Sequence, residues 1–359
     1  MILTVTPNPS LDRTYVTGPL HLGEVNRAST ETVEASGKGV NVSRALHAAG
    51  TRTLAVLPAG GTEGEHLRLL LEADGLPYAL VPVSAPTRTN TTVAEAGGRT
   101  TKVNSPGAPL RPAERDALVA MVARHAGSAG WAVFSGSLPP GSERDLLPRL
   151  LDAARGAGAR TAVDTSGEAL AVAAGCAVDL LAPNATELAS LTGRPLPGSG
   201  PALVAAAVRA AAEVHARTGS ALLVSLGADG AVFVSGDVAL HGVAPPVTPV
   251  NTAGAGDALL AGWLHGEALG VLASAEDRLR LRSPGDTLGV LASARDRLRL
   301  RSPGDGDPAG RLARGVSWGT AACLMPGTAG DVAALADPGS VRVTGRETGT
   351  TGARTVAPP

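Results

Sequence analysis

The chain has 359 residues, of which 44% are hydrophobic and 18% charged, and its formal net charge is −1. This composition is that of a globular protein, and the absence of a basic surplus argues against a partner that is nucleic acid or an anionic membrane. Cys176 and Cys323 show no Cys-x-x-Cys or His spacing, so we expect small buried side chains instead of a disulfide framework or a zinc site. We expect a cytoplasmic protein, because residues 1–5 enter a strand at once and no apolar run reaches membrane-spanning length.

Short apolar runs alternate with helical patterns along the chain. After a first strand within residues 1–5, we predict buried parallel strands at residues 54–57, 131–134, 160–164, 179–182 and 221–225. Helical patterns occupy residues 41–49, 62–73, 112–125, 142–157 and 201–217. This alternation predicts an α/β fold with a doubly wound, mostly parallel sheet flanked by helices, whose strand ends carry the ligand site.

Two segments interrupt the alternation. Residues 14–33 and 88–103 are richer in Thr and Val, and Gly97-Gly98 between two alternating runs predicts a two-residue hairpin turn. The simplest account is a small β-sheet that projects from the main domain and covers a site; a decorative hairpin is the alternative. We place this lid at about residues 12–35 and 87–105, within a single domain of residues 1–340.

A nearly identical segment occurs twice near the carboxyl end. Residues 269–286 recur at residues 288–305 with one change, from Glu276 to Arg295. Two copies cannot form a solenoid, and long loop insertions cost little free energy, so we interpret residues 269–305 as a duplicated, solvated and partly disordered insert. Its arginines would suit a phosphate but are more typical of a solvated face. Residues 341–359, rich in Gly, Thr and Pro, are expected to be an unstructured tail.

Residues 251–257, Asn-Thr-Ala-Gly-Ala-Gly-Asp, precede an apolar helical run and are the most informative segment. Small residues expose backbone N–H groups at a helix start, where the dipole favours an anion. A carboxylate beside a bound phosphate predicts that Asp257 accepts a proton from a hydroxyl, while the amides of Gly254, Ala255 and Gly256 stabilise a transferring phosphoryl group. The alternative is a glycine-rich loop with an ordinary N-cap aspartate. The chain lacks the nucleotide loop Gly-x-x-x-x-Gly-Lys-Ser/Thr.

Four further patches fit the same phosphoryl-transfer site. Asp12 follows the first strand and could accept hydrogen bonds from sugar hydroxyls. Residues 36–41, Ser-Gly-Lys-Gly-Val-Asn, open a helix in which Lys38 offers a point charge and Asn41 offers amide groups. The guanidinium of Arg88 suits a phosphate. Residues 135–141 follow a buried strand, as expected of a loop at a topological switch point.

Together and in this order, these segments resemble the ribokinase-like carbohydrate kinases, in particular their phosphosugar branch. The resemblance runs from Leu3 to about Gly327, interrupted by the insert, and its most specific elements are residues 37–41, 135–141, 163–170 and 251–257. Residues 6–12, 23–27 and 101–107 look most like the 1-phosphofructokinases. The resemblance implies a large α/β domain with a small β-sheet lid, which in relatives is often also the dimer contact.

The resemblance also implies roles for individual residues. Asp257 matches the catalytic base, and the anion hole matches Gly254, Ala255 and Gly256. Asp12, Gly39 and Asn41 match the family's residues that contact the sugar hydroxyls. Lys38, Arg88 and Ser137 match the residues that hold the phosphate already present on the substrate. The nucleotide loop matches Ser225, Leu226, Gly227, Ala228, Asp229 and Gly230. Asn184 and Glu187 match a motif that organises Mg²⁺ and phosphates through water, which suits a strongly hydrated cation.

Simpler interpretations of two of these motifs stay open. Asn184 followed three residues later by Glu187 is also a capping pattern, and residues 227–230 could be only a hairpin turn. The chain also departs from the family. Ser36 replaces a usual glycine, Ala182 replaces a usual lysine, and the insert follows the helix that begins near Asp257. The last two departures are expected to weaken nucleotide binding.

The sequence therefore predicts an enzyme that uses ATP and Mg²⁺ to phosphorylate D-fructose 1-phosphate at its 6-hydroxyl, giving fructose 1,6-bisphosphate. The enzymatic alternatives are a 6-phosphofructokinase and a tagatose-6-phosphate kinase. The alternative from another class is a catalytically silent sugar-phosphate-binding protein. The expected partners are the sugar phosphate, ATP and a second copy of the chain bound through the lid.

Overall fold

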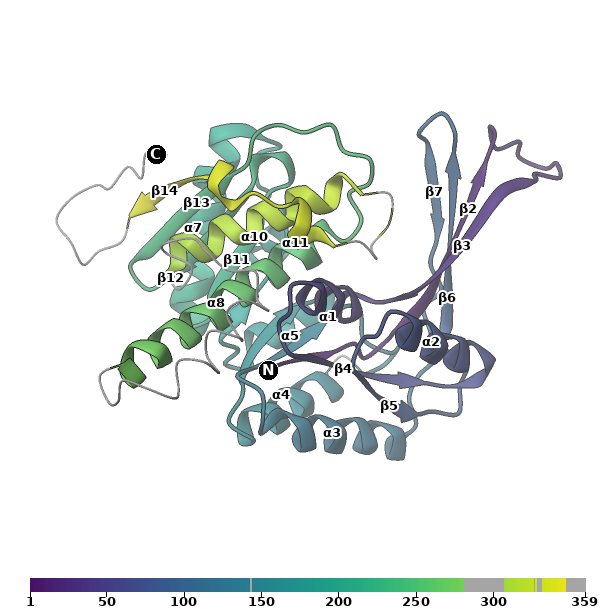
Figure 1. Cartoon of the computed structure of the whole chain (residues 1–359), viewed down its shortest axis with the longest axis horizontal. Coiled ribbons are helices and arrows are strands. Elements are labelled where there is room, and N and C mark those ends of the chain that lie inside the picture. The colour runs from purple at the N-terminus through teal and green to yellow at the C-terminus, as the bar shows by residue number, and fades with distance from the viewer. Residues whose placement is uncertain (143, 281–306, 326, 328–330, 347–359) are drawn as a thin grey trace.

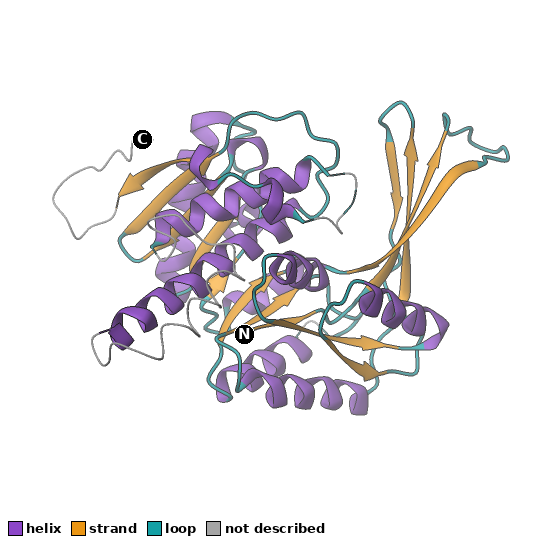
Figure 2. Ribbon diagram, in the orientation of Figure 1, coloured by secondary structure: helices purple, strands orange, loops and turns teal. Residues whose placement is uncertain are grey.

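The computed structural model describes residues 1–142, 144–280, 307–325, 327 and 331–346. Within them, a ten-stranded sheet has the spatial order β14-β13-β12-β11-β10-β9-β8-β1-β4-β5 (Figures 1 and 2). Its strands are β1 (Ile2–Val5), β4 (Thr53–Ala59), β5 (Tyr78–Pro82), β8 (Trp131–Ser135), β9 (Arg160–Asp164), β10 (Leu180–Leu181), β11 (Ala221–Ser225), β12 (Ala231–Ser235), β13 (Val238–Val243) and β14 (Arg342–Arg346). The strands from β5 to β11 in this order are parallel, whereas β12, β13 and β14 are antiparallel. The mostly parallel sheet predicted from the alternation is confirmed.

The direction of winding changes between β1 and β8. From β1 the chain proceeds to β4 and β5 on one side, and later to β8 through β11 on the other. Loops that leave neighbouring strands in opposite directions open a crevice at the carboxyl ends of those strands. The loops after β1 and β8 therefore begin at the place where a doubly wound sheet carries its ligand.

Helices cover both faces of this sheet (Figure 2). One hydrophobic core joins the sheet to α3 (Pro112–Ala126), α4 (Leu146–Gly156), α5 (Gly167–Ala174), α6 (Ala185–Thr192) and α7 (Gly200–Thr218). The other joins it to α1 (Lys38–Ala48), α8 (Ala255–Arg280), α10 (Pro308–Cys323) and α11 (Val332–Leu335). In β1, Leu3 and Val5 belong to the first core and Ile2 to the second, because successive side chains of a strand point to opposite faces.

A second sheet projects from the main body (Figure 1). Its order is β3 (Ala28–Ser36), β2 (Ser10–Thr17), β6 (Arg88–Glu95) and β7 (Thr100–Val103). The pairing of β2 with β6 is parallel, and the other two pairings are antiparallel. Gly97-Gly98 lies in the predicted turn, but the connection spans four residues instead of two. Gly98 has φ 87° and its amide donates to the Glu95 carbonyl oxygen at 2.8 Å, which fits a longer hairpin loop with a left-handed glycine. This small sheet packs at its base against α2 (Gly61–Ala73).

Two expectations about the carboxyl-terminal part were wrong in the described residues. The supposed tail begins with β14, which extends the large sheet because its backbone groups pair with β13. The first twelve residues of the supposed insert, 269–280, continue α8, because their sequence is rich in helix-forming Leu, Ala, Glu and Arg and contains no proline. The rest of the insert and residues 347–359 lie outside the described residues.

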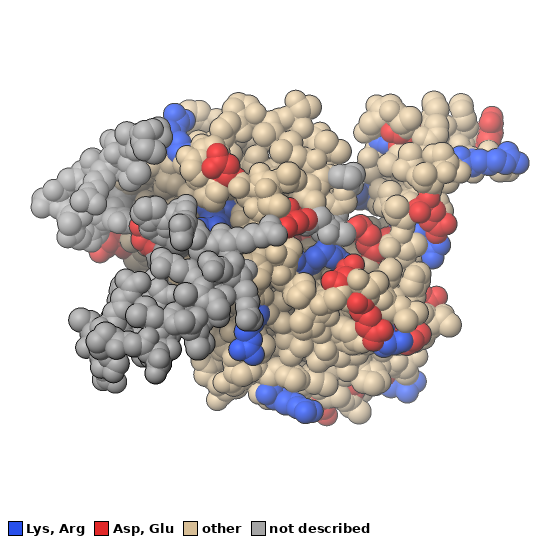
Figure 3. All heavy atoms as spheres, viewed as in Figure 1, with Lys and Arg blue, Asp and Glu red and all other residues tan. Residues whose placement is uncertain are grey.

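Among the described helices, none is both long and apolar enough to cross a membrane. On the face drawn in Figure 3, acidic and basic side chains of the described residues are intermixed instead of being separated into patches of one sign. This arrangement agrees with the net charge of −1.

Candidate active site

The amino end of α1 packs directly on the carboxyl end of β1. A Cβ atom on Gly39 would lie 2.4 Å from Thr6 Oγ1, and Gly37 has φ 129°. Only glycine fits such a close approach and such a backbone angle. The observed reason for Gly39 is therefore packing, and its effect is to hold Lys38 and Asn41, its neighbours on α1, beside the strand ends.

The loops after β8 and β9 meet at the same place. The Gly136 amide donates to the Asp164 carbonyl oxygen at 2.9 Å, and Thr165 Oγ1 donates to the Gly136 carbonyl oxygen at 2.9 Å. Lys38 Nζ forms an ion pair with Asp164 Oδ1 at 2.7 Å. Asp164 lies within residues 163–170, but the sequence gives it no role, since nothing local to β9 indicates that Lys38, 126 positions earlier, is its partner.

Asp257 is the third residue of α8, so it is not the N-cap residue of that helix. Its side chain is buried, and Asn41 Nδ2 donates to its Oδ2 atom at 2.8 Å. Burial, and then the negative charge of Asp164, raise the pKa of Asp257 to about 7, although Lys38 and the hydrogen bond from Asn41 act in the opposite direction. A carboxylate whose pKa lies near neutrality is suited to accept a proton at physiological pH.

Lys38 is surrounded by carboxylates. Burial disfavours its charged form, but Asp164, then Asp257, and also Glu187 raise the pKa of Lys38 above its ordinary value. The ammonium group therefore stays charged within this site. A fixed positive charge close to Asp257 can attract a substrate phosphate and also stabilises the ionised form of the carboxylate.

Arg88 and Ser137, two of the candidate phosphate contacts, lie together. The half-buried guanidinium of Arg88 donates to the carbonyl oxygens of Asn8 at 3.0 Å and Ser105 at 2.7 Å, and to Ser137 Oγ at 3.5 Å. Burial lowers the pKa of Arg88. Asn8 Nδ2 donates to Ser137 Oγ at 3.2 Å, so these three residues form one hydrogen-bonded group at the base of the small sheet.

Asp12 lies across the same sheet. Its carboxylate accepts hydrogen bonds from Ser36 Oγ at 2.7 Å, Ser10 Oγ at 2.8 Å and Asn90 Nδ2 at 2.9 Å. Arg88 and Asn90 stand opposite Ser10 and Asp12 in the register of β6 and β2. The parallel pairing of these two strands therefore brings the basic and the acidic candidate residues together, and it adds Asn90, which the sequence did not identify.

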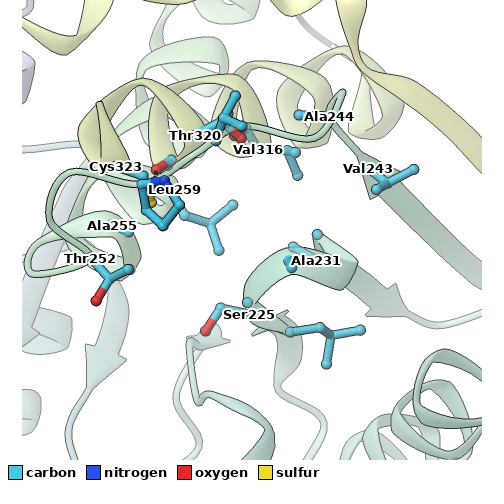
Figure 4. Close-up of a pocket in the computed structure, with 18 of the residues that line it drawn as sticks. Ser225, Ala231, Val243, Ala244, Thr252, Ala255, Leu259, Val316, Thr320 and Cys323 are labelled. Atoms are coloured by element: carbon cyan, nitrogen blue, oxygen red, sulfur yellow. Dashed lines mark hydrogen bonds between the residues drawn. The ribbon is translucent and has the colours of Figure 1, made fainter. Parts of the chain in front are cut away.

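A cavity of about 1040 Å³ opens beside the first turns of α8 (Figure 4). Figure 4 shows Leu259, Val316, Ala231 and Ser225 around it, on α8, α10 and the β11–β12 region. The cavity is lined by all but one of the predicted nucleotide residues, namely Asn184, Ser225, Leu226, Gly227, Ala228 and Gly230. The exception is Asp229, whose Oδ2 atom accepts a hydrogen bond from the Gly200 amide at 3.0 Å, at the start of α7. Residues 226–230 connect the antiparallel strands β11 and β12, with a 3-10 turn at residues 227–229, so the hairpin interpretation is confirmed. The same loop also lines the cavity.

The cavity and the carboxylate meet at the amino end of α8. Ala255 and Gly256 line the cavity, Gly254 has φ 80°, and Asp257 follows directly. The first N–H groups of a helix have no acceptor within the helix, so this end offers donors and a positive dipole to an anion. An anion in the cavity can thus approach Asp257 across a single turn of backbone.

The cavity also has walls that the sequence did not identify. They come from the segment after β13, including Val243 to Val247, and from α10, including Cys323. Cys323 is intermediate in exposure and lines the cavity, so it is not the fully buried residue that was expected; Cys176 is also intermediate. The Val250 amide donates to the Cys323 carbonyl oxygen at 2.7 Å, which fixes the segment against the end of α10.

The insert lies in the sequence between two helices that line the cavity, α8 and α10. Helices α8 and α10 run antiparallel, with Gly315 beside Leu259 and Gly319 beside Ala255. Arg280 follows Ala255 by 25 residues of continuous helix, which corresponds to about 37 Å. On the other side of the insert, α10 begins at Pro308, only eight residues before the cavity-lining Val316, which corresponds to about 12 Å of helix.

Asn184 and Glu187 form a capping box at the start of α6. Asn184 Oδ1 accepts from the Glu187 amide at 2.9 Å, and Glu187 Oε2 accepts from the Asn184 amide at 2.8 Å. The capping interpretation is confirmed, while Asn184 also lines the cavity. No group of three or more His, Cys, Asp or Glu residues among the described ones could hold a metal ion. A cation that takes most of its ligands from phosphates and water, as Mg²⁺ does, fits this donor set.

Comparisons with known proteins agree with this geometry. A model of the pfkB family carbohydrate kinases matches residues 8–276. The chain is 40% identical over 282 residues to a 1-phosphofructokinase of Haloferax volcanii, covering 78% of this chain and 88% of the relative. It is 37% identical over 263 residues to the ATP-dependent 6-phosphofructokinase isozyme 2 of Escherichia coli, covering 72% and 83%. The crystal structure of phosphofructokinase-2 from Escherichia coli in complex with fructose-6-phosphate is similar with a TM-score of 0.74 and 31% identity, covering 93% of this chain and 97% of that one.

Proposed function

Because the chain belongs to the pfkB family of carbohydrate kinases, we propose that it transfers the γ-phosphoryl group of ATP to the 6-hydroxyl of D-fructose 1-phosphate. It is an ATP-dependent sugar-phosphate kinase of the phosphofructokinase type. The observation that carries the proposed chemistry is Asp257, which is buried, has a pKa near neutrality and follows the cavity-lining Gly256. Fructose 1-phosphate is supported by the similarity to the 1-phosphofructokinase of Haloferax volcanii.

The existing phosphate of the sugar would bind between two cations. Lys38 and Arg88 supply a point charge and a planar guanidinium, and Ser137 Oγ lies within hydrogen-bonding distance of Arg88. The hydroxyls of the sugar would be held by Asp12, by the backbone of Gly39 and by Asn41. These contacts would direct the 6-hydroxyl toward Asp257, where fixed orientation removes much of the entropic barrier.

In the chemical step, Asp257 accepts the proton of the sugar 6-hydroxyl while the oxygen of that hydroxyl attacks the γ-phosphorus in line. The bond from the γ-phosphorus to the β-γ bridging oxygen breaks, and ADP leaves. The amides of Gly254, Ala255 and Gly256 stabilise negative charge that develops on the phosphoryl oxygens. When bound, Mg²⁺ would neutralise phosphate charge, and Glu187 would orient it through water. The nucleotide would occupy the cavity along residues 225–230 and Asn184.

A kinetic panel tests the substrate. Purified protein is offered fructose 1-phosphate, fructose 6-phosphate and tagatose 6-phosphate with ATP and Mg²⁺, and kcat/KM is compared. We expect the highest value for fructose 1-phosphate. A preference for fructose 6-phosphate would favour a 6-phosphofructokinase, as the relative from Escherichia coli is named. Binding of sugar phosphate without release of ADP would favour the silent binding protein instead.

Two further expectations belong to the proposal. The small sheet exposes Val103 and, beyond β2, Leu22 and Val25, which supports a homodimer formed through the sheet. Size-exclusion chromatography with light scattering would contradict this expectation if it gave the mass of one chain. A cytoplasmic location follows from the proposed substrates, and fractionation of the source cells would check it.

A further inference from the structure

A buried arginine stands behind the catalytic carboxylate. Arg44 lies on α1, one turn after Asn41, and only 6% of its surface is exposed. Its Nη2 atom donates to the Ala35 carbonyl oxygen at 2.8 Å and to Asp74 Oδ2 at 3.0 Å. Its Nη1 atom donates to Asn41 Oδ1 at 3.3 Å. The guanidinium is thus fixed from three directions, and one of its contacts reaches a residue that touches Asp257.

The contact between Arg44 and Asn41 determines how the amide of Asn41 is oriented. A guanidinium has donors and no acceptor, so the atom of Asn41 that faces it must be the oxygen. The NH₂ group then points to the opposite side, where Nδ2 donates to Asp257 Oδ2 at 2.8 Å. A flipped amide would turn donors toward the guanidinium and an oxygen toward a carboxylate, and both contacts would be repulsive.

On this geometry, and resting on the proposed function, we propose that Arg44 is a positioning residue for the phosphoryl-transfer reaction: it fixes the Asn41 amide so that its NH₂ group faces Asp257. Arg44 acts through Asn41, since its side chain donates hydrogen bonds to Ala35, Asp74 and Asn41. Asp74, at the carboxyl end of α2, anchors the guanidinium from outside.

Loss of Arg44 leaves the Asn41 amide free to rotate and weakens its hydrogen bond to the carboxylate. Burial and Asp164 raise the pKa of Asp257, while Lys38 on α1 and the Asn41 hydrogen bond lower it. The Arg44→Met variant should therefore hold a proton on Asp257 up to a higher pH. The free energy of a hydrogen bond to a charged group corresponds to a pKa shift of about one unit. The acidic limb of the kcat/KM profile should therefore move to higher pH by about one unit.

The test measures the pH profile of kcat/KM for wild type, Arg44→Met, Asn41→Ala and the double variant. We expect both single variants to shift the acidic limb upward and the double variant to shift it no further, because the two residues act in series. Arg115→Met is the matched control. Arg115 also donates to a backbone carbonyl and pairs with a carboxylate, but on α3 and without contact to Asn41. Its profile should be unchanged.

The proposal is overturned if the acidic limb of the kcat/KM profile does not shift in Arg44→Met. It is also overturned if the shift of the double variant equals the sum of the two single shifts. If Arg44→Met does not fold, Arg44→Lys keeps the charge but not the forked donors, and the same upward shift is expected. The failure of the proposed function is distinguishable, because wild-type protein would then phosphorylate none of the sugars. In that case a carbon-13 NMR titration of the Asp257 carboxylate still reports whether Arg44→Met raises its pKa.

Discussion

Replacing Asp257 by Asn should separate activity from stability. The variant keeps the size of the side chain, and the oxygen of the new amide can still accept the hydrogen bond from Asn41 Nδ2. It can no longer accept the proton of the sugar hydroxyl. Because a positioned general base contributes about 10²- to 10⁴-fold, we expect kcat to fall by that factor while KM for ATP changes little.

The same substitution should stabilise the protein at neutral and alkaline pH. Burial, followed by Asp164, raises the pKa of Asp257 from its ordinary value of 3.8 to about 7. The folded state therefore favours the protonated acid. The contribution of protonated Asp257 to the stability of the wild-type folded state is fully present below about pH 4. It is lost as the pH rises through about 7, which lowers the unfolding free energy by about 4 kcal/mol.

Urea unfolding at pH 5 and pH 8 measures this effect. The difference in unfolding free energy between Asp257→Asn and wild type should grow in favour of the variant by about 2–3 kcal/mol between the two pH values. Asp307→Asn is the control, because Asp307 is an exposed carboxylate that caps α10, and its loss should not become favourable at high pH. Equal differences at both pH values, or near-normal turnover in Asp257→Asn, would refute the reasoning.

Three other outcomes are expected. Arg88→Lys should raise KM for the sugar phosphate about tenfold while KM for ATP stays constant, because an ammonium cannot replace the planar fork; equal changes in both constants would count against a sugar-phosphate contact. Gly39→Ala should lower the melting temperature by the equivalent of about 2–4 kcal/mol, because the new Cβ atom would lie 2.4 Å from Thr6 Oγ1. The control is Gly156→Ala, whose Cβ atom would meet open space, so it should be neutral or slightly stabilising. Deletion of residues 287–305, which keeps one copy of the repeat, should leave kcat/KM for ATP unchanged, and a clear loss would show that the repeat influences the nucleotide site.

Much of the fold followed from local pattern. Apolar runs at residues 131–134 and 221–225 and helical periodicity at residues 112–125 each correspond to an observed element, because periodicity reports which side of an element is buried. The pattern did not indicate β12, β13 and β14 as an antiparallel edge of the large sheet. The strand β14 lies in a segment whose composition suggested a tail, and pairing with β13 overrides that weak preference.

The sequence alone predicted Asp257 as the candidate proton acceptor, since its glycine-rich surroundings are contiguous and their chemistry is local. Which side chains surround that carboxylate was decided only by tertiary structure. Asn41 lies 216 positions away and Lys38 pairs with a residue 126 positions away, so their contacts depend on the order in which β1, β8 and β9 assemble. Asp164, Asn90 and Arg44 were not identified for the same physical reason. A hydrogen bond across the fold is specified by strand order and helix docking, and neither is encoded by the spacing of residues along the chain.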